Sequence, residues 1–208
     1  FFSDIEPLAA SKVLVRLENE TLSIGQRILS QGLQLTVRGQ DKIGIIGPNG
    51  VGKSTLLAKL HQLLSGKREI SLGFMPQDYQ ETLQLDLSPV EFLSQTGHKE
   101  EIQKIQSHLA SLNFSYPEMH HQIHSLSGGQ QGKLLLLNLV LRKPNFLLLD
   151  EPTRNFSPTS QPEIRKLFAN YSGGLVTVSH DRRFLKEVCT SIYSLTEHGL
   201  EVVDLQDL

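Results

Sequence analysis

One octapeptide constrains the fold of this chain more than any other feature. It fits the pattern G-x-x-x-x-G-K-[ST] with the residues Gly47-Pro48-Asn49-Gly50-Val51-Gly52-Lys53-Ser54. A short apolar run, 42–46, precedes it, and leucines at helical spacing follow it from Leu56 to Leu64. The glycines allow the backbone to fold so that successive N–H groups point at phosphate oxygens. The octapeptide therefore predicts a phosphate-binding loop between a buried strand and the start of a helix.

The last residues of this loop predict which ligand it holds. Lys53 would bring a positive charge to the β- and γ-phosphates of a nucleotide, and the hydroxyl of Ser54 would bind Mg²⁺. Thr55, the next residue of the helix, completes the set that we expect at the phosphates. The alternative is a chance glycine-rich turn, which the flanking strand and helix disfavour. We expect ATP with Mg²⁺ as the ligand.

Two carboxylates follow another apolar run, 146–149. They are Asp150 and Glu151, at the end of a predicted buried strand. In open α/β sheets, ligands bind beyond the carboxyl ends of the strands, where the phosphate-binding loop would also lie. Asp150 could hold Mg²⁺ through its water shell, and Glu151 could accept a proton from an attacking water. The alternative is a solvated strand terminus without a catalytic role.

The order of apolar and polar segments predicts an α/β fold. We expect strands at 12–18, 33–37, 42–46, 70–74, 146–149 and 175–178, and a buried helix at 134–141 that Pro144 ends. The polar stretch 78–125 predicts a small helical lobe inserted into the main unit. We therefore expect a single domain over 1–208, with a core of 1–77 and 126–208. Because the chain opens on Phe1 and not on Met, we expect a fragment of a longer polypeptide.

Bulk properties exclude several classes of protein. The formal net charge of −2 gives no general attraction to nucleic acid or to anionic membranes. The longest apolar run, 134–141, is far shorter than the roughly 20 residues of a membrane-spanning helix, so we expect no membrane insertion. The single cysteine, Cys189, suits a reducing compartment, and we expect the cytoplasm. A catalytic thiol is the alternative role for Cys189, and its apolar surroundings favour a buried structural residue.

A second glycine-containing segment introduces a family resemblance. A serine followed by two glycines indicates a helix N-terminus with exposed N–H groups, and such a terminus can bind an anion. The residues Leu126-Ser127-Gly128-Gly129-Gln130 also match the signature sequence of ATP-binding-cassette (ABC) ATPases. Three more matches follow the order of that family: Gln77, the segment Asp150-Glu151-Pro152-Thr153, and the segment Val178-Ser179-His180-Asp181.

The resemblance implies a fold and a set of roles. The fold would be an ABC-type P-loop NTPase with a mixed sheet and antiparallel strands on its N-terminal side. Gln77 would touch Mg²⁺ or the attacking water, so the expected metal set is Ser54, Gln77 and Asp150. His180 would reach the γ-phosphate, and the catalytic set is Glu151, His180 and Gln77. The segment Ser127-Gly128-Gly129-Gln130 would contact the ATP of a second cassette, with ATP enclosed between the two.

Within the superfamily, the chain looks most like the C-terminal cassette of a bacterial ABC-F protein. This class has no membrane domain, acts on ribosomes and includes antibiotic-resistance factors. The resemblance rests on the segments 17–23, 47–50 and 178–184 and on the variant 151–158, where Phe156-Ser157 replaces the general Leu-Asp. It implies the ribosome as a partner through regions outside this chain. The alternatives are the ATP-binding subunit of a membrane transporter and a chromosome or repair protein, whose long heptad repeats are missing.

His120 and His124 lie four residues apart, as in a zinc-binding helix, but no Glu or Cys completes the set, so a solvated turn is favoured.

ABC domains usually stack an aromatic ring on adenine from a loop before the phosphate-binding loop. That position falls near Ile24, and 3–73 contain no Phe, Tyr or Trp. We therefore expect weak discrimination between purine bases.

Overall fold

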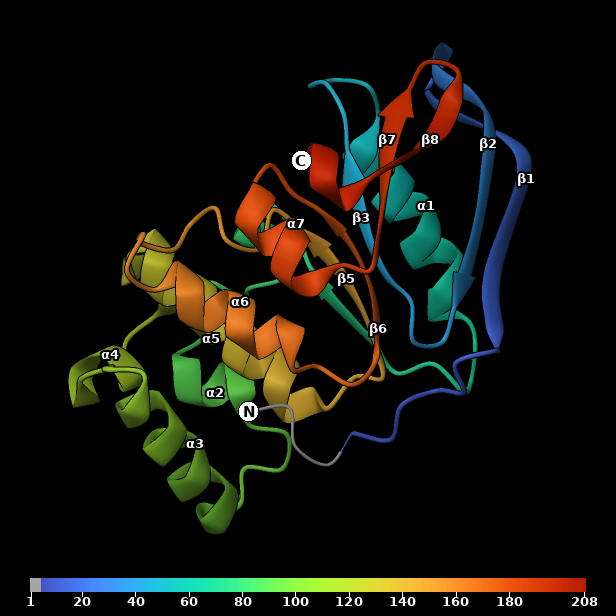
Figure 1. The fold of residues 1–208 in the computed structure, drawn as a ribbon. Helices are drawn as coiled ribbons and strands as arrows, with labels where there is room; N and C mark the ends of the chain where they lie inside the picture. The colour runs from blue at the N-terminus through green and yellow to red at the C-terminus, as the bar shows by residue number, and fades with distance from the viewer. Residues whose placement is uncertain (1–4) are drawn as a thin grey trace.

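The computed structural model describes residues 5–208, and its centre is a six-stranded sheet. Five strands are parallel, and the edge strand β8 runs antiparallel to β7 (Figure 1). The spatial order is β4 (Leu72–Met75), β5 (Phe146–Asp150), β6 (Gly174–Val178), β3 (Lys42–Ile46), β7 (Ser191–Thr196) and β8 (Gly199–Val203). The strands β5, β6 and β3 are neighbours, so residues that follow them meet at one edge of the sheet.

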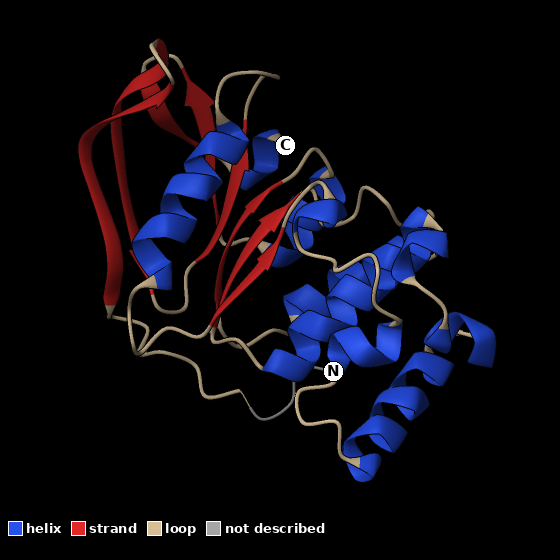
Figure 2. Ribbon diagram, turned by 180° about the vertical axis from the view of Figure 1, so that it is seen from behind, coloured by secondary structure: helices blue, strands red, loops and turns tan. Residues whose placement is uncertain are grey.

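A separate antiparallel hairpin precedes this sheet. It consists of β1 (Val13–Ile24) and β2 (Arg27–Arg38), joined at Gly25, whose φ is +58°. Helix α1 (Lys53–Ser65) lies between the hairpin and the main sheet, and one apolar cluster joins all three (Figures 1 and 2). We expected two shorter strands at 12–18 and 33–37. They are longer because cross-strand pairing continues through polar stretches and register shifts, which interrupt the apolar alternation.

The remaining helices lie on the other side of the main sheet (Figure 2). A second apolar cluster joins the sheet to α5 (Gly128–Arg142), α6 (Gln161–Ala169) and α7 (Arg182–Val188). Between β4 and α5 the chain forms α2 (Pro89–Leu93), α3 (Lys99–Ser111) and α4 (Tyr116–His120). Short 3₁₀ turns complete the fold at Tyr79–Glu81, Ile123–Ser125 and Leu205–Asp207. The mixed α/β architecture with an antiparallel N-terminal hairpin agrees with the expected fold class.

Strand β4 begins two residues later than the sequence suggested. We expected a strand at 70–74, and the structure has it at Leu72–Met75. The side chain of Asn145 bonds the backbone just before the strand, accepting from Ser71 N at 2.9 Å and donating to Glu69 O at 3.0 Å. These bonds hold the preceding backbone in a turn. Apolar character alone does not reveal such a side-chain bond.

Two features that the sequence left open are structural in this fold. Cys189 directly follows α7 and is buried, and this burial raises the pKa of its thiol to about 12. A thiol with that pKa is not a nucleophile at neutral pH, so Cys189 packs as a small apolar residue. His120 lies at the end of α4, where its ring contacts that of Tyr116 at a tilt of 44°, with the centroids 4.5 Å apart. Within 5–208, no group of three potential ligands among His, Cys, Asp and Glu is placed to hold a metal ion.

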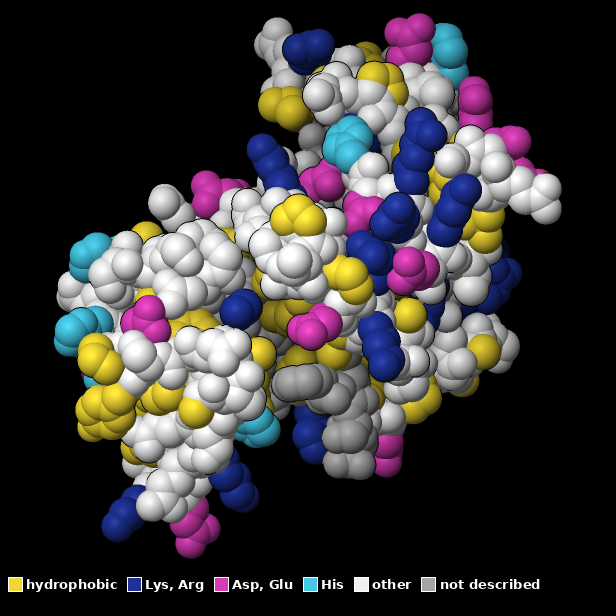
Figure 3. All heavy atoms as spheres, turned by 60° about the vertical axis from the view of Figure 1, so that its left-hand side comes forward, with side chains coloured by type: hydrophobic (Ala, Val, Ile, Leu, Met, Phe, Trp, Pro, Cys, Tyr) yellow, Lys and Arg dark blue, Asp and Glu magenta, His cyan; other side chains and the backbone are white. Residues whose placement is uncertain are grey.

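The surface mixes apolar and charged side chains. Figure 3 shows hydrophobic side chains interspersed with acidic ones and with a row of Lys and Arg on the sheet side of the molecule. The large apolar side chains that are exposed include Ile24 and Ile28 near the hairpin turn and Val202 on the edge strand. None of the helices described between residues 5 and 208 combines the length and hydrophobicity that crossing a membrane requires.

Candidate nucleotide site

The phosphate-binding loop has the backbone that the octapeptide pattern predicts. Gly47, Gly50 and Gly52 have φ values of +147°, +80° and +109°, which L side chains rarely adopt. A Cβ on Gly47 would lie 2.6 Å from the carbonyl oxygen of Leu195, so only glycine fits there. Gly52 is the N-cap of α1 and has no side chain to bond the first N–H groups of the helix. Those N–H groups remain available for an anion.

Lys53 folds back over this loop. Its Nζ donates hydrogen bonds of 2.8 Å to the carbonyl oxygens of Gly47 and Pro48, and only 8% of the residue is exposed. Burial lowers the pKa of its ammonium group, and the carboxylates of Glu151 and Asp150 oppose that shift. An ammonium group has three donor hydrogens, so this position can also serve a phosphate oxygen above the loop.

Ser54 and Asp150 form the polar floor beside Lys53. The Ser54 hydroxyl donates a 2.7 Å hydrogen bond to Oδ2 of Asp150, which joins the start of α1 to the end of β5. Asp150 is 6% exposed, and burial raises its carboxyl pKa while the Ser54 bond and Lys53 act in the opposite direction. A hydroxyl and a carboxylate oxygen side by side are the hard ligands that Mg²⁺ prefers. These residues therefore fit the metal ion that the octapeptide implies.

Glu151 is held by the segment that follows β6. Its Oε2 accepts a 3.2 Å hydrogen bond from the His180 backbone N–H, and its Oε1 lies 3.4 Å from His180 Nε2. Its backbone has a φ of +52°, uncommon for a residue with a side chain and frequent at functional sites. Burial raises the pKa of the Glu151 carboxyl, and the bond from His180 limits the rise. A carboxylate with a raised pKa is a better proton acceptor at neutral pH.

These residues enclose a cavity of about 770 Å³. Ten of the residues predicted from the sequence line it: Asn49, Gly50, Gly52, Lys53, Ser54, Thr55, Gln77, Asp150, Glu151 and His180. Gly47 and Pro48 lie beneath it as acceptors for Lys53, and Val51 packs in the apolar cluster behind the loop. Ile24 also lines the cavity, at the position expected for the base.

Five lining residues were not predicted as site residues. They are Leu29, Thr153, Arg154, Val178 and Asp181. Four of them lie inside the segments that carry the family resemblance, but we had assigned them no role there. Leu29 comes from β2, and nothing in the sequence connects that strand to the loop. In the structure its side chain lies beside Gly52, 3.1 Å from where a Cβ would be.

The segment Ser127-Gly128-Gly129-Gln130 lies elsewhere, at the N-terminus of α5. Ser127 is the N-cap, its Oγ accepting from Gln130 N at 3.2 Å, and Gln130 Oε1 accepts from Ser127 N at 3.0 Å. A Cβ on Gly128 would meet nothing within 4 Å, so this turn is open to an approaching molecule. The segment does not line the cavity above the phosphate-binding loop.

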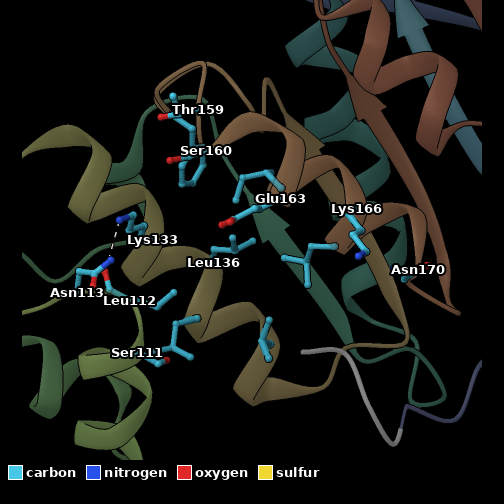
Figure 4. A pocket seen from close by; sticks show the side chains of 15 residues that line it. Ser111, Leu112, Asn113, Lys133, Leu136, Thr159, Ser160, Glu163, Lys166 and Asn170 are labelled. Carbon is cyan, nitrogen blue, oxygen red and sulfur yellow. Dashed lines mark hydrogen bonds between the residues drawn. The ribbon is translucent and has the colours of Figure 1, made fainter.

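A second cavity, of about 810 Å³, lies between helices on the other side of the sheet (Figure 4). Its walls come from the end of α3, from α5 and from α6, with Lys133, Glu163 and Lys166 among the polar side chains. None of the residues predicted to bind nucleotide or metal lines it.

The fold and the cavity together define a P-loop nucleotide-binding cassette. The sequence model of the family described as "ABC transporter" matches residues 30–154. This chain belongs to the ABC transporter family, whose cassettes are ATPases.

The curated relatives are of ABC-F-like type. "Probable ATP-binding protein YheS" of Escherichia coli K12 is 31% identical over 210 aligned residues, which is 98% of this chain and 33% of that protein. "ABC transporter F family member 2" of Arabidopsis thaliana is 26% identical, over 92% of this chain and 29% of that protein. The chain thus spans about a third of the length of these relatives. The resemblance to ABC-F cassettes agrees with both matches.

Solved structures share the fold. The cassette MJ0796, in a dimer bound to ADP and Pi, gives a TM-score of 0.75 at 20% identity, covering 91% of this chain and 98% of that one. A bacterial Atm1-family ABC exporter with ATP bound gives a TM-score of 0.75 at 17% identity, over 99% of this chain and 41% of that chain. At such identities these similarities establish the fold.

Proposed function

We propose that this cassette binds ATP with Mg²⁺ in the cavity above the phosphate-binding loop and hydrolyses it. One observation carries the proposal. Glu151, a carboxylate with a burial-raised pKa, is fixed by two nitrogen atoms of His180 at the same cavity as Lys53 and Ser54. A proton acceptor thus stands beside a cradle for phosphate groups, which is the arrangement that hydrolysis of a phosphoanhydride needs.

Each residue has a defined task in this proposal. The loop N–H groups and Lys53 bind the β- and γ-phosphates and stabilise the charge that develops on them. Ser54, Asp150 and Gln77 would hold Mg²⁺, which neutralises phosphate charge when bound. Glu151 accepts the proton of the attacking water. His180 holds the Glu151 carboxylate from one side and presents its ring, which is largely exposed, to the γ-phosphate.

Replacing Lys53 with Ala tests nucleotide binding. The change removes the positive charge at the phosphates and leaves the loop glycines intact, so the Kd for Mg-ATP should rise by about tenfold or more, since a charge-assisted hydrogen bond is worth about 1.5–3 kcal/mol. Isothermal titration calorimetry measures it. Lys59→Ala is the matched control, because Lys59 lies on the same helix and pairs with Glu20 outside the cavity. Equal affinity in both variants would exclude Lys53 from the site.

The hairpin contributes two aliphatic residues to the lining of the cavity. They are Ile24, at the end of β1, and Leu29, near the start of β2. Ile24 is 62% exposed, so a base resting there would meet one branched side chain in place of a ring. A ring stacked on a base contributes about 1–3 kcal/mol, and the phosphate contacts do not distinguish purines. We infer that this cassette accepts GTP as well as ATP.

GTP should therefore displace ATP with a Kd within about tenfold of that for ATP, which corresponds to 1.4 kcal/mol. Ile24→Tyr should tighten ATP binding by about fivefold or more through the added stack, at the lower end of the range for such contacts. Ile28→Tyr is the control, because Ile28 is exposed on the same hairpin and does not line the cavity. Competition binding with a fluorescent nucleotide measures both. A strong preference for ATP in the unchanged protein would refute this interpretation of Ile24.

We propose further that the cassette works by closing on a second cassette, as part of a cytoplasmic protein of ABC-F type that acts on ribosomes. The open turn at Ser127 and the dimeric arrangement of the similar MJ0796 cassette support the pairing. The relatives of ABC-F type support the class. Sedimentation of a lysate from the source cells tests the partner: native protein should migrate with ribosomes when ATP is present and hydrolysis is blocked. Sedimentation apart from ribosomes under those conditions would contradict the assignment.

A further inference from the structure

Arg165 is the only buried arginine among residues 5–208, and it joins α6 to α7. Its residue exposure is 7%. Its Nε donates a 3.2 Å hydrogen bond to Oε1 of Glu187, and one terminal nitrogen lies 3.9 Å from Oδ2 of Asp181. Removing a guanidinium group from water is costly unless its partners are fixed. Both partners belong to the segment that begins with His180.

The two carboxylate oxygens of Asp181 face two different helices, α7 and α6. Oδ1 accepts a 3.0 Å hydrogen bond from Phe184 N and so caps α7. Oδ2 is buried and has no hydrogen-bond partner, which leaves the Arg165 guanidinium as the positive charge paired with it. The backbone N–H of Asp181 is also fixed, since it donates to Ser179 Oγ at 3.0 Å. The residue directly after His180 is therefore held by Phe184 N, by Ser179 Oγ and by the charge of Arg165.

Helix α6 contacts both the loop after Glu151 and the segment after His180. At its start, the Gln161 side chain donates to the carbonyl oxygens of Thr153 and Phe156, in the loop that follows Glu151. One turn later, Arg165 holds Asp181. Further along, the Phe168 ring meets Phe184 of α7 edge-on at 5.9 Å between centroids. The helix thus connects the segment after Glu151 to the segment after His180.

We propose that Arg165 is a positioning residue that sets the orientation of His180 towards Glu151 through Asp181. The proposal rests on the proposed hydrolysis at Glu151. The distances between Glu151 and His180, 3.2 Å to the backbone nitrogen and 3.4 Å to Nε2, depend on where residues 180 and 181 lie. Displacement of a catalytic group by about 1 Å can cost a hundredfold in rate. A change at Arg165 therefore affects the reaction without touching substrate.

Four variants separate this role from general stability. Arg165→Met keeps the length and apolar packing of the side chain and removes its charge. Asp181→Asn keeps an oxygen that can cap α7 and removes the charge that faces Arg165. Glu187→Gln is the control, because it changes the outer, half-exposed partner of Arg165 and retains an acceptor. Arg165→Lys serves as the conservative variant, which should recover part of the function if the charge matters.

The first measurement follows the His180 ring signals by NMR, assigned by their loss in His180→Gln. Arg165→Met should move these signals, Arg165→Lys should move them less, and Glu187→Gln should leave them in place. The second measurement is steady-state ATP hydrolysis, where Arg165→Met should lower kcat by about tenfold or more with a smaller change in KM. In the double variant with Asp181→Asn, the loss in kcat should match that of the more damaged single variant.

The outcomes distinguish this inference from the proposed function. Unchanged His180 signals in Arg165→Met would overturn the inference, even if its melting temperature falls. If Arg165→Met does not fold, Arg165→Lys and Asp181→Asn decide the same question by the same signals. Absence of hydrolysis in the unchanged protein together with moved His180 signals would refute the proposed function and leave the positioning role supported.

Discussion

Glu151→Gln should lower the rate of ATP hydrolysis by about 10²–10⁴-fold, the usual contribution of a general base. The amide retains the shape of the carboxylate and can still accept the bond from His180 N, but it cannot take a proton from water. Binding of Mg-ATP should persist, because Lys53, Ser54 and the loop N–H groups are unchanged. Phosphate release measures the rate, and calorimetry measures the affinity.

Glu163→Gln is the matched control for this experiment. Glu163 lies on α6 at the cavity of Figure 4, so losing its charge should not alter hydrolysis. The contrast between the two variants separates a specific loss of the base from a general effect of removing a negative charge. Equal turnover in Glu151→Gln and the unchanged protein would remove Glu151 from the mechanism.

The second large effect is expected at Ser127. If the turn at the start of α5 completes the site of a second cassette, Ser127→Arg should fill that turn and nearly abolish hydrolysis. Activity should return when this variant is mixed with Glu151→Gln, because each mixed pair contains one site with neither defect. Random pairing in an equimolar mixture gives about a quarter of the unchanged rate when the sites act independently. Specific activity should also rise with protein concentration.

Loss of a helix cap must be separated from loss of the partner contact. Ser88→Ala is the control, because Ser88 caps α2 with the same reciprocal bonds and does not line the cavity. It should cost about 1 kcal/mol of stability, as Ser127→Arg does, and leave turnover unchanged. Mixtures that stay inactive, or activity independent of concentration in a monomer, would contradict a site shared between two cassettes.

The convergence of the candidate site residues could be predicted largely from sequence, because these residues lie at the ends of three neighbouring strands. Each apolar run ends on residues with distinctive chemistry: Gly47 after β3, Asp150 at the end of β5 and Ser179 after β6. Parallel strands bring their carboxyl ends to one edge, so the residues converge even though they are far apart in the chain. The roles assigned to Gln77 and to Ser127 rest on the family resemblance and remain proposals.

Other features depend on contacts that no local pattern shows. Strands β7 and β8 are short and half-exposed, and we did not predict them because polar residues break their alternation. The ion pair of Arg165 with Asp181 joins residues from separate helices, and a lone arginine in an amphipathic helix usually faces solvent. The hydrogen bonds of Lys53 to Gly47 and Pro48 follow from how the loop folds back on itself, which the motif does not specify.

Because two cavities of similar size lie in this fold, an experiment can test which of them binds the nucleotide. We expect titration of Mg-ATP into ¹⁵N-labelled Glu151→Gln protein to shift the backbone amide signals of Gly47, of residues 49–55, of Gln77 and of His180. The signals of Lys133 and Lys166, at the cavity of Figure 4, should stay in place. The Glu151→Gln variant prevents turnover during the measurement. Shifts centred on α5 and α6, with the phosphate-binding loop unaffected, would contradict the assignment of the nucleotide site.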